Sequence, residues 1–167
     1  MERHREYNGT LLLIGTVVLF LGTGIYLVSR PGDSAYFLRY NPFDMPSPPV
    51  IPGTLGDIVR ALPSFTHVFS FILLTAGLVR TGNRGHIVIC AGWCIVDCLF
   101  ETGQRYGTVI AAIIPDWFQG IPFLENTANF FRLGTFDPID LAATIIGTAA
   151  AYVVIRMLTN KKDKELS

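Results

Sequence analysis

Long apolar stretches alternate with polar or proline-rich segments along this chain. Four stretches are apolar enough to cross a bilayer: residues 10–28, 64–79, 86–104 and 138–158. An α-helix rises about 1.5 Å per residue, so some 20 residues match the roughly 30 Å hydrocarbon core of a membrane. The first stretch is longer than the about 7–15 apolar residues of a signal peptide, which favours a retained helix. The pattern predicts an all-α integral membrane protein, a bundle of four transmembrane helices.

Two longer segments separate these predicted helices. Residues 30–63 hold seven of the ten prolines of the chain. Prolines interrupt helices, so we predict a loop here, with at most a short amphipathic turn near residues 55–62. Residues 105–137 are apolar but are broken by two prolines and several glycines. We expect this second segment either to re-enter the membrane or to lie on its surface, and the sequence leaves both interpretations open.

Small residues recur on the first and fourth predicted helices. Gly15 and Gly22 lie seven residues apart, and Ala143, Gly147 and Ala151 repeat every four. Such faces allow the backbones of two membrane helices to approach closely. We therefore expect both helices to pack through these faces.

The amount and placement of charge refine this picture. Charged residues make up 16% of the chain, whereas about 25% is typical of soluble domains. The formal net charge is zero, which gives no indication of a nucleic-acid surface. With four spans, one membrane side carries eight of the thirteen lysines and arginines, mostly on short segments. Such residues favour the cytoplasmic side, so we predict a plasma-membrane protein with a cytoplasmic N-terminus, a cytoplasmic tail at 159–167 and outward loops at 30–63 and 105–137.

Six polar residues gather near the predicted outer ends of three helices. They are His67 in the second span, Asp97, Glu101 and Gln104 in the third, and Asp137 and Asp140 at the start of the fourth. At about 100° per residue, the three polar residues of the third span, together with Cys90 and Cys94, fall within an arc of about 80° on one side of that helix. A carboxylate at a helix centre costs about 2.5–3.5 kcal/mol on insertion, so it should find a partner. His67 is the nearest predicted partner, and Arg105 and Arg132 are alternatives.

These residue types can carry chemistry or hold a ligand. Glu101 and Asp97 are candidate general acids or bases, with His67 as their proton partner. The candidate ligand-binding residues are Gln104, Asp137, Asp140 and Arg132. An ionisable residue inside a membrane is by default a functional candidate, and Asp97 has the fewest structural explanations among them.

Several of the same residues also have structural explanations. Asp137 directly precedes Pro138, a combination that is typical of a helix N-terminus, and Asp140 suits the dipole of the first helical turn. Glu101 and Gln104 can be ordinary helix-end residues at the level of the headgroups. The three cysteines all lie in the third span and are expected to be small packing residues. We accordingly predict no metal site and no bound cofactor.

The order of these motifs resembles that of the VanZ-like family of bacterial membrane proteins. The resemblance covers residues 62–152 and rests on THVFSF around His67, on ETGQ from Glu101 to Gln104, and on TFDPIDLAATIIG. It implies a small protein of the bacterial cell envelope, in a family with one member linked to glycopeptide-antibiotic resistance. Three positions depart from the family pattern, since Pro63, Gly134 and Thr144 stand where it usually has an aspartate, an arginine and an asparagine.

Three kinds of function remain open from the sequence. The first is a non-enzymatic envelope protein that binds a lipid-linked precursor, a headgroup or a protein partner at the outer leaflet. The second is a membrane enzyme that acts on a lipid-linked substrate through acid–base chemistry, with Asp137 and Asp140 available to hold a divalent cation. The third is a structural subunit of a membrane complex. The lipid bilayer is the partner that all three share.

Overall fold

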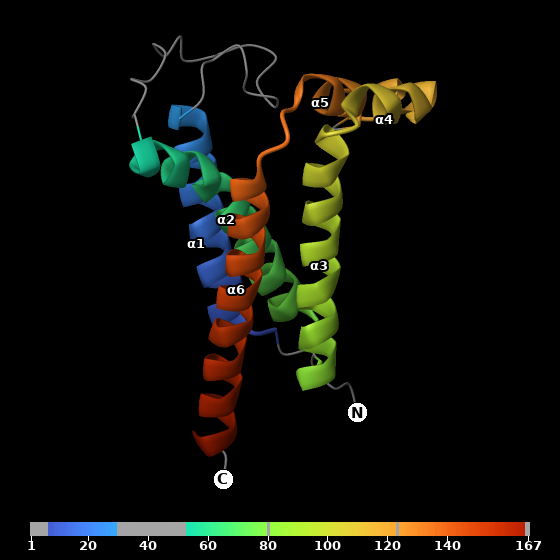
Figure 1. Ribbon diagram of the computed structural model, residues 1–167. Helices are drawn as coiled ribbons and strands as arrows, with labels where there is room; N and C mark the ends of the chain where they lie inside the picture. The colour runs from blue at the N-terminus through green and yellow to red at the C-terminus, as the bar shows by residue number, and fades with distance from the viewer. Residues whose placement is uncertain (1–6, 30–52, 80, 123, 166–167) are drawn as a thin grey trace.

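The computed structural model describes residues 7–29, 53–79, 81–122 and 124–165, and every regular element in these ranges is a helix. Its long helices are α1 (Gly9–Ser29), α2 (Gly53–Leu78), α3 (Asn83–Gln104) and α6 (Pro138–Glu165) (Figure 1). Each of the four contains a stretch long and apolar enough to cross a membrane. The predicted fold class, an all-α membrane protein with four long apolar helices, is therefore confirmed.

The helix α2 begins well before the position expected from the sequence. It starts at Gly53, where the backbone φ of +75° suits glycine, and it continues through Pro63. The prediction of a loop for residues 53–63 is therefore wrong, while residues 30–52 of that predicted loop lie outside the described residues. Proline removes one helical hydrogen bond, but it can bend a helix without ending it. Figure 1 shows this bend: the first turns of α2 lie across the end of the bundle, and the rest runs along it.

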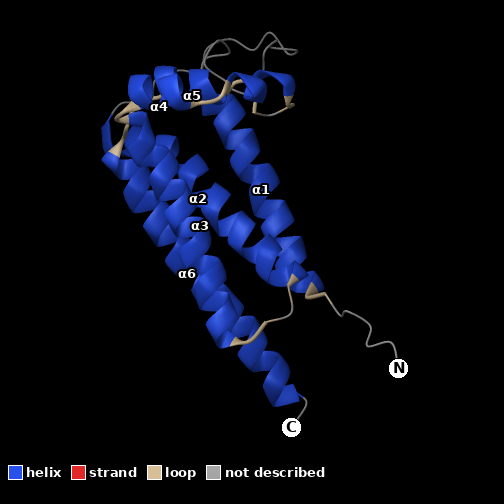
Figure 2. Ribbon diagram, turned by 90° about the vertical axis from the view of Figure 1, so that its right-hand side faces the viewer, coloured by secondary structure: helices blue, strands red, loops and turns tan. Residues whose placement is uncertain are grey.

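The segment between α3 and α6 forms three short helices. These are α4 (Gly107–Ile113), the 3₁₀-helix η2 (Asp116–Gly120) and α5 (Thr127–Leu133). In Figures 1 and 2, α4 and α5 lie crosswise at the end of α3 and do not pass between the long helices. Their exposed large apolar side chains include Val109, Ile113, Trp117 and Leu133. Of the two interpretations left open by the sequence, the structure shows the surface-lying, interfacial one.

The central helix of the bundle is α2, because it packs against both α1 and α6. The largest fully buried apolar side chains are Leu11 of α1, Val68, Ile72 and Leu73 of α2, and Ile155 of α6. Glycines bring these helices together: a Cβ added at Gly22 would overlap the side chain of Thr66, and one at Gly147 would press on the backbone of Phe65. The expected close contact through small residues on α1 and α6 is confirmed.

The helix α3 is the least embedded of the four. It packs against α6 and, over fewer residues, against α2. Its outer surface exposes large apolar side chains such as Val88 and Leu99, as suits a helix that faces lipid. The polar side of α3 is turned toward α2 and α6, where the candidate site lies.

Candidate functional site

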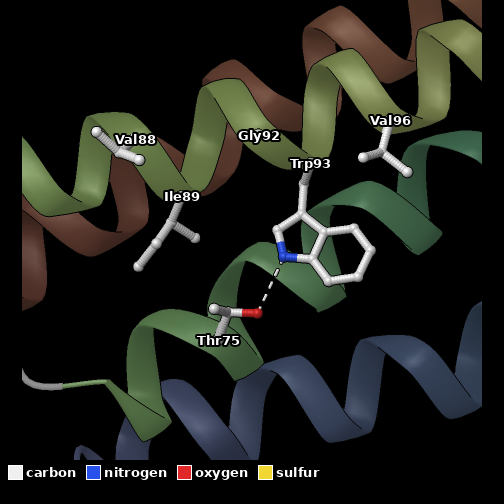
Figure 3. Close-up of a pocket in the computed structure, with 6 residues that line it drawn as sticks. All are labelled: Thr75, Val88, Ile89, Gly92, Trp93 and Val96. Atoms are coloured by element: carbon white, nitrogen blue, oxygen red, sulfur yellow. Dashed lines mark hydrogen bonds between the residues drawn. The ribbon is translucent and has the colours of Figure 1, made fainter.

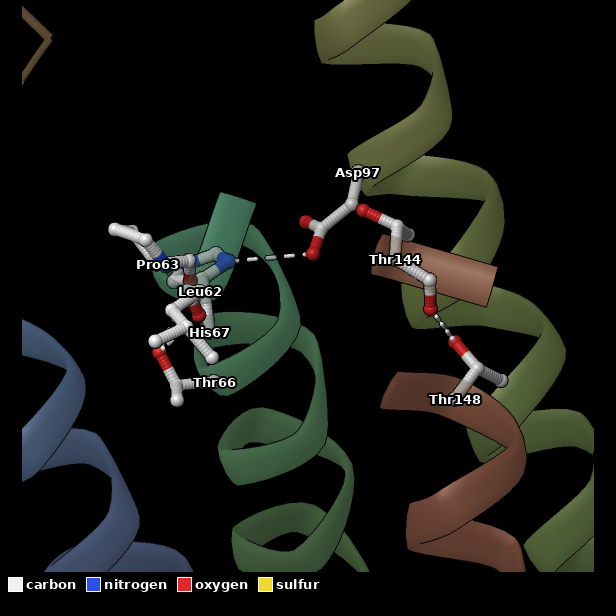
Figure 4. Close-up of polar contacts among 7 residues, drawn as sticks. All are labelled: Leu62, Pro63, Thr66, His67, Asp97, Thr144 and Thr148. Atoms are coloured by element: carbon white, nitrogen blue, oxygen red, sulfur yellow. Dashed lines mark hydrogen bonds and ion pairs between the residues drawn. The ribbon is translucent and has the colours of Figure 1, made fainter. Parts of the chain in front are cut away.

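The side chains of His67 and Asp97 meet across the contact between α2 and α3 (Figure 4). The imidazole Nδ1 lies 3.2 Å from Asp97 Oδ2. The Asp97 side chain is only 12% exposed, whereas that of His67 is 50% exposed. A carboxylate that is this far removed from solvent requires a hydrogen-bonding partner, and the histidine supplies one. The structure thus brings together the pair that the sequence placed nearest.

The second nitrogen of the His67 ring, Nε2, makes no hydrogen bond within the described ranges. When the ring is neutral and Nδ1–H donates to Asp97, Nε2 is an acceptor; when the ring is protonated, Nε2–H is a donor. One face of the ring packs on Phe71, at 4.5 Å between centroids, and Phe71 in turn packs on Trp93 at 4.8 Å. Asp97 and Phe71 therefore orient an imidazole whose other nitrogen can meet a ligand.

An apolar groove of about 240 Å³ lies between α2 and α3 (Figure 3). Its lining residues are Thr75 from α2 and Val88, Ile89, Gly92, Trp93 and Val96 from α3. The Thr75 hydroxyl accepts a hydrogen bond of 3.0 Å from the Trp93 indole N–H, so the two polar side-chain groups of the lining are paired with each other. Val96 directly precedes Asp97 in the chain. The lining residue Trp93 packs on Phe71, which packs on His67, so the groove adjoins the His67–Asp97 pair through this aromatic contact.

Glu101 joins the end of α3 to the start of α6. Its Oε1 accepts a hydrogen bond of 2.7 Å from the backbone N–H of Asp137, and its Oε2 accepts one of 3.2 Å from Gln104 Nε2. Asp137 Oδ1 accepts a 2.9 Å hydrogen bond from the N–H of Ile139, which is the geometry of a helix N-cap. The capping role predicted for Asp137 is confirmed. We call the set of Glu101, Gln104 and Asp137 the α3–α6 bracket.

Three other candidate residues from the sequence are Asp140, Arg132 and Arg105. Asp140 is half-buried in the first turn of α6. Arg132 is exposed in the last turn of α5, and it forms no ion pair with any residue that the structure describes. The guanidinium of Arg105 lies 5.7 Å from the centre of the Phe136 ring. Neither arginine contacts Asp97, so histidine is the partner of that carboxylate.

A second polar cluster, at the opposite end of α3, was missed in the sequence. Asn83 Oδ1 accepts hydrogen bonds from Tyr152 OH at 3.2 Å and from Arg156 Nη1 at 3.0 Å. His86 is buried one turn along α3 from Asn83. The available signal was the four-residue spacing of Tyr152 and Arg156, which places both on one side of α6. This cluster ties α3 to α6 at the other end of the bundle.

The structure adds little in favour of a metal ion. The three cysteines are free thiols, and Cys90 is buried in the core. Within the described parts of the chain, no group of three or more His, Cys, Asp or Glu side chains is placed to hold a metal ion. The chemistry that the described residues offer is therefore that of an oriented imidazole, a buried carboxylate and an adjoining apolar groove.

No protein-family model matches this chain, and no curated protein or solved structure matches it either.

Proposed function

We propose that this four-helix membrane protein is a non-enzymatic, VanZ-like protein of the bacterial envelope that binds the polar end of a membrane lipid at the outer leaflet. The observation that carries the proposal is the half-exposed imidazole of His67, which Asp97 holds through one nitrogen while the other stays available. A polar group next to an apolar groove matches an amphiphile, which has a polar end and a hydrocarbon chain.

The distribution of positive charge supports this placement. The start of α3, which carries Arg84, and the last turns of α6, which carry three lysines, lie at the end opposite α4 and α5 (Figure 1). Lysines and arginines favour the cytoplasmic side. The end that carries α4 and α5 is then the outer end, and His67 lies about one helical turn below the bend of α2 at Pro63.

The bonding of Glu101 favours binding over acid–base catalysis by that residue. Both of its carboxylate oxygens accept hydrogen bonds within the α3–α6 bracket. A general acid or base must reach the proton that it transfers. The two hydrogen bonds of Glu101 instead hold the start of α6 in position. The proposal accordingly assigns ligand contact to His67 and positioning to Asp97 and Glu101.

The proposal is tested by the lipid that accompanies the purified protein. Wild-type protein is purified from bacterial membranes in mild detergent, its lipid is extracted, and the amount of each lipid per protein is measured by mass spectrometry. His67→Ala removes the hydrogen bond to the ligand, and we expect about a tenfold loss of one lipid class, as follows from roughly 1.4 kcal/mol. Asp116→Asn, a change at an exposed position on η2, is the control and should keep the wild-type profile. An unchanged profile in His67→Ala would refute the proposal.

A second candidate function, lipid-modifying catalysis, is favoured by the same contact. An imidazole oriented by a carboxylate is the arrangement of a general base. The extraction experiment separates the two functions, because a binding defect lowers the amount of a lipid without changing its mass. If His67→Ala instead retains a lipid of different mass from the wild type, the protein converts that lipid and the enzymatic alternative is correct.

A further inference from the structure

We infer that the groove between α2 and α3 holds one fatty-acyl chain of an outer-leaflet phospholipid, whose polar end reaches His67. This inference rests on the proposed function and goes further, since it names the class of lipid and the path of its chain. Its starting point is the groove of about 240 Å³, which adjoins the His67–Asp97 pair through the contacts of Trp93 with Phe71 and of Phe71 with His67.

The lining of the groove excludes polar occupants. Val88, Ile89, Gly92 and Val96 offer only apolar side chains or none, and the Thr75 hydroxyl is paired with the Trp93 indole. A polar ligand would lose its hydration here without gaining hydrogen bonds, which is unfavourable. A water molecule needs two to four polar partners, and this lining does not supply them. Hydrocarbon is the occupant that fits.

The size of the groove fits a single chain. Its volume of about 240 Å³ is smaller than the roughly 300–1,000 Å³ of pockets that take compact, drug-sized ligands. From Val88 to Val96 it follows α3 over eight residues, about 12 Å, and one leaflet contributes roughly 15 Å of hydrocarbon. The Val96 end of the groove directly precedes Asp97 in the chain, and its Val88 end lies nearer the start of α3 and the other membrane side. An acyl chain of the outer leaflet has this length and direction.

The bilayer around the groove contains the molecule that we expect to occupy it. The groove lies on α3, whose exposed surface includes Val88 and Val96, and so it continues the surface that faces lipid. Phospholipid is the amphiphile of the bilayer into which it opens. Because lipid tails are as apolar as the groove, burial of the chain alone provides little preference. The preference comes from the polar end at His67, and the groove fixes where the chain lies.

Gly92 offers a way to fill the groove without disturbing the protein. A side chain added at Gly92 would meet no atom within 4 Å, so it would enter the open groove. The change Gly92→Leu also replaces glycine by a better helix former. Gly24 on α1 is the matched control, since it is also an exposed helical glycine with nothing within 4 Å of an added Cβ.

The experiment uses photo-cross-linking in vesicles. The full chain is reconstituted with phosphatidylethanolamine that carries a diazirine in one acyl chain, and cross-linked residues are located by mass spectrometry. In the wild type we expect cross-links in the segment 88–96 and at Thr75. We expect about a tenfold decrease there for Gly92→Leu, equivalent to roughly 1.4 kcal/mol, and no change for Gly24→Leu. Unchanged thermal unfolding of Gly92→Leu shows that the variant is folded.

Each other outcome has a definite meaning. Cross-links spread evenly over all lipid-facing helices, or unaffected by Gly92→Leu, would refute the inference, and a loss of lipid in His67→Ala would still support the proposed function. Cross-links in the groove that disappear in Gly92→Leu, together with no effect of His67→Ala, would support the chain path and refute the role of the polar pair. A change of oligomeric state in Gly92→Leu would show that a second copy of the chain fills the groove, and would also refute the inference.

Discussion

Two of the helices that contact α2, namely α1 and α3, pack against it in opposite ways. Toward α1, glycines remove side chains from the contact, so that a Cβ at Gly15 would lie within 3.1 Å of the Ser70 carbonyl oxygen. Toward α3, long polar and aromatic side chains bridge the gap, as His67 and Trp93 do, and an open groove remains. We call the contact between α1 and α2 the closed contact and the contact between α2 and α3 the open contact.

The closed contact holds the bundle together, and the open contact leaves side chains accessible to lipid. Association of membrane helices depends on van der Waals packing and hydrogen bonds, because lipid offers the same apolar surroundings as another helix. Direct backbone contact, as between α1 and α2, gains the most from packing and leaves no room for a ligand. A bridged contact, as between α2 and α3, leaves imidazole and indole groups within reach of lipid. We therefore expect stability to depend on the first contact and lipid binding on the second.

The largest expected effect on stability is at the closed contact. Leucine at Gly22 would overlap the side chain of Thr66, so we expect Gly22→Leu to separate α1 from α2 and to lower the free energy of unfolding by about 3 kcal/mol. Thermal unfolding in detergent measures this. Gly24→Leu, two residues along the same helix, should unfold as the wild type does, because nothing lies within 4 Å of an added Cβ there. Equal unfolding of both variants would contradict the closed contact.

A smaller effect is expected at the α3–α6 bracket. Glu101→Ala removes the acceptor for the backbone N–H of Asp137, and leaving that donor unpaired costs about 2 kcal/mol. We expect faster amide hydrogen exchange at residues 137–141 and little change in α1 or α2. Glu101→Gln keeps an oxygen acceptor. It should therefore keep most of the protection from amide exchange, and it should bind as much lipid as the wild type. Loss of lipid in Glu101→Gln with a protected helix start would instead indicate an acid–base role for the carboxylate.

The parts of this structure that the sequence predicts are those with local causes. Hydropathy places four apolar helices, and the Asp137–Pro138 pair predicts the cap of α6 because capping depends on neighbouring residues only. The start of α2 was not predictable in this way, since Pro63 is compatible with either an end or a bend. Packing against α1 and α6 decides between them, and packing is not visible in a single sequence.

The candidate site shows the same division. The polar stripe of α3 and the need of Asp97 for a partner followed from the cost of a charge in a membrane, and His67 is that partner. The partner of Glu101 on α6 is a backbone N–H, which every residue except proline carries and which no side-chain pattern marks. The groove depends on the distance between α2 and α3. It could therefore be recognised only once both helices were placed.

The smallest expected effect is at a bridge of the open contact. Thr75→Val keeps the shape of the side chain and removes the acceptor for the Trp93 indole, and hydrogen bonds between membrane helices average about 0.6 kcal/mol. We expect nearly unchanged thermal unfolding but a more mobile indole, with stronger fluorescence quenching by lipids brominated along their chains. The measurement is made in a Trp117→Phe background, in which Trp93 is the remaining tryptophan. If Thr75→Val instead destabilised the protein as much as Gly22→Leu, the open contact would be as important for stability as the closed one, and the division between support and access would not hold.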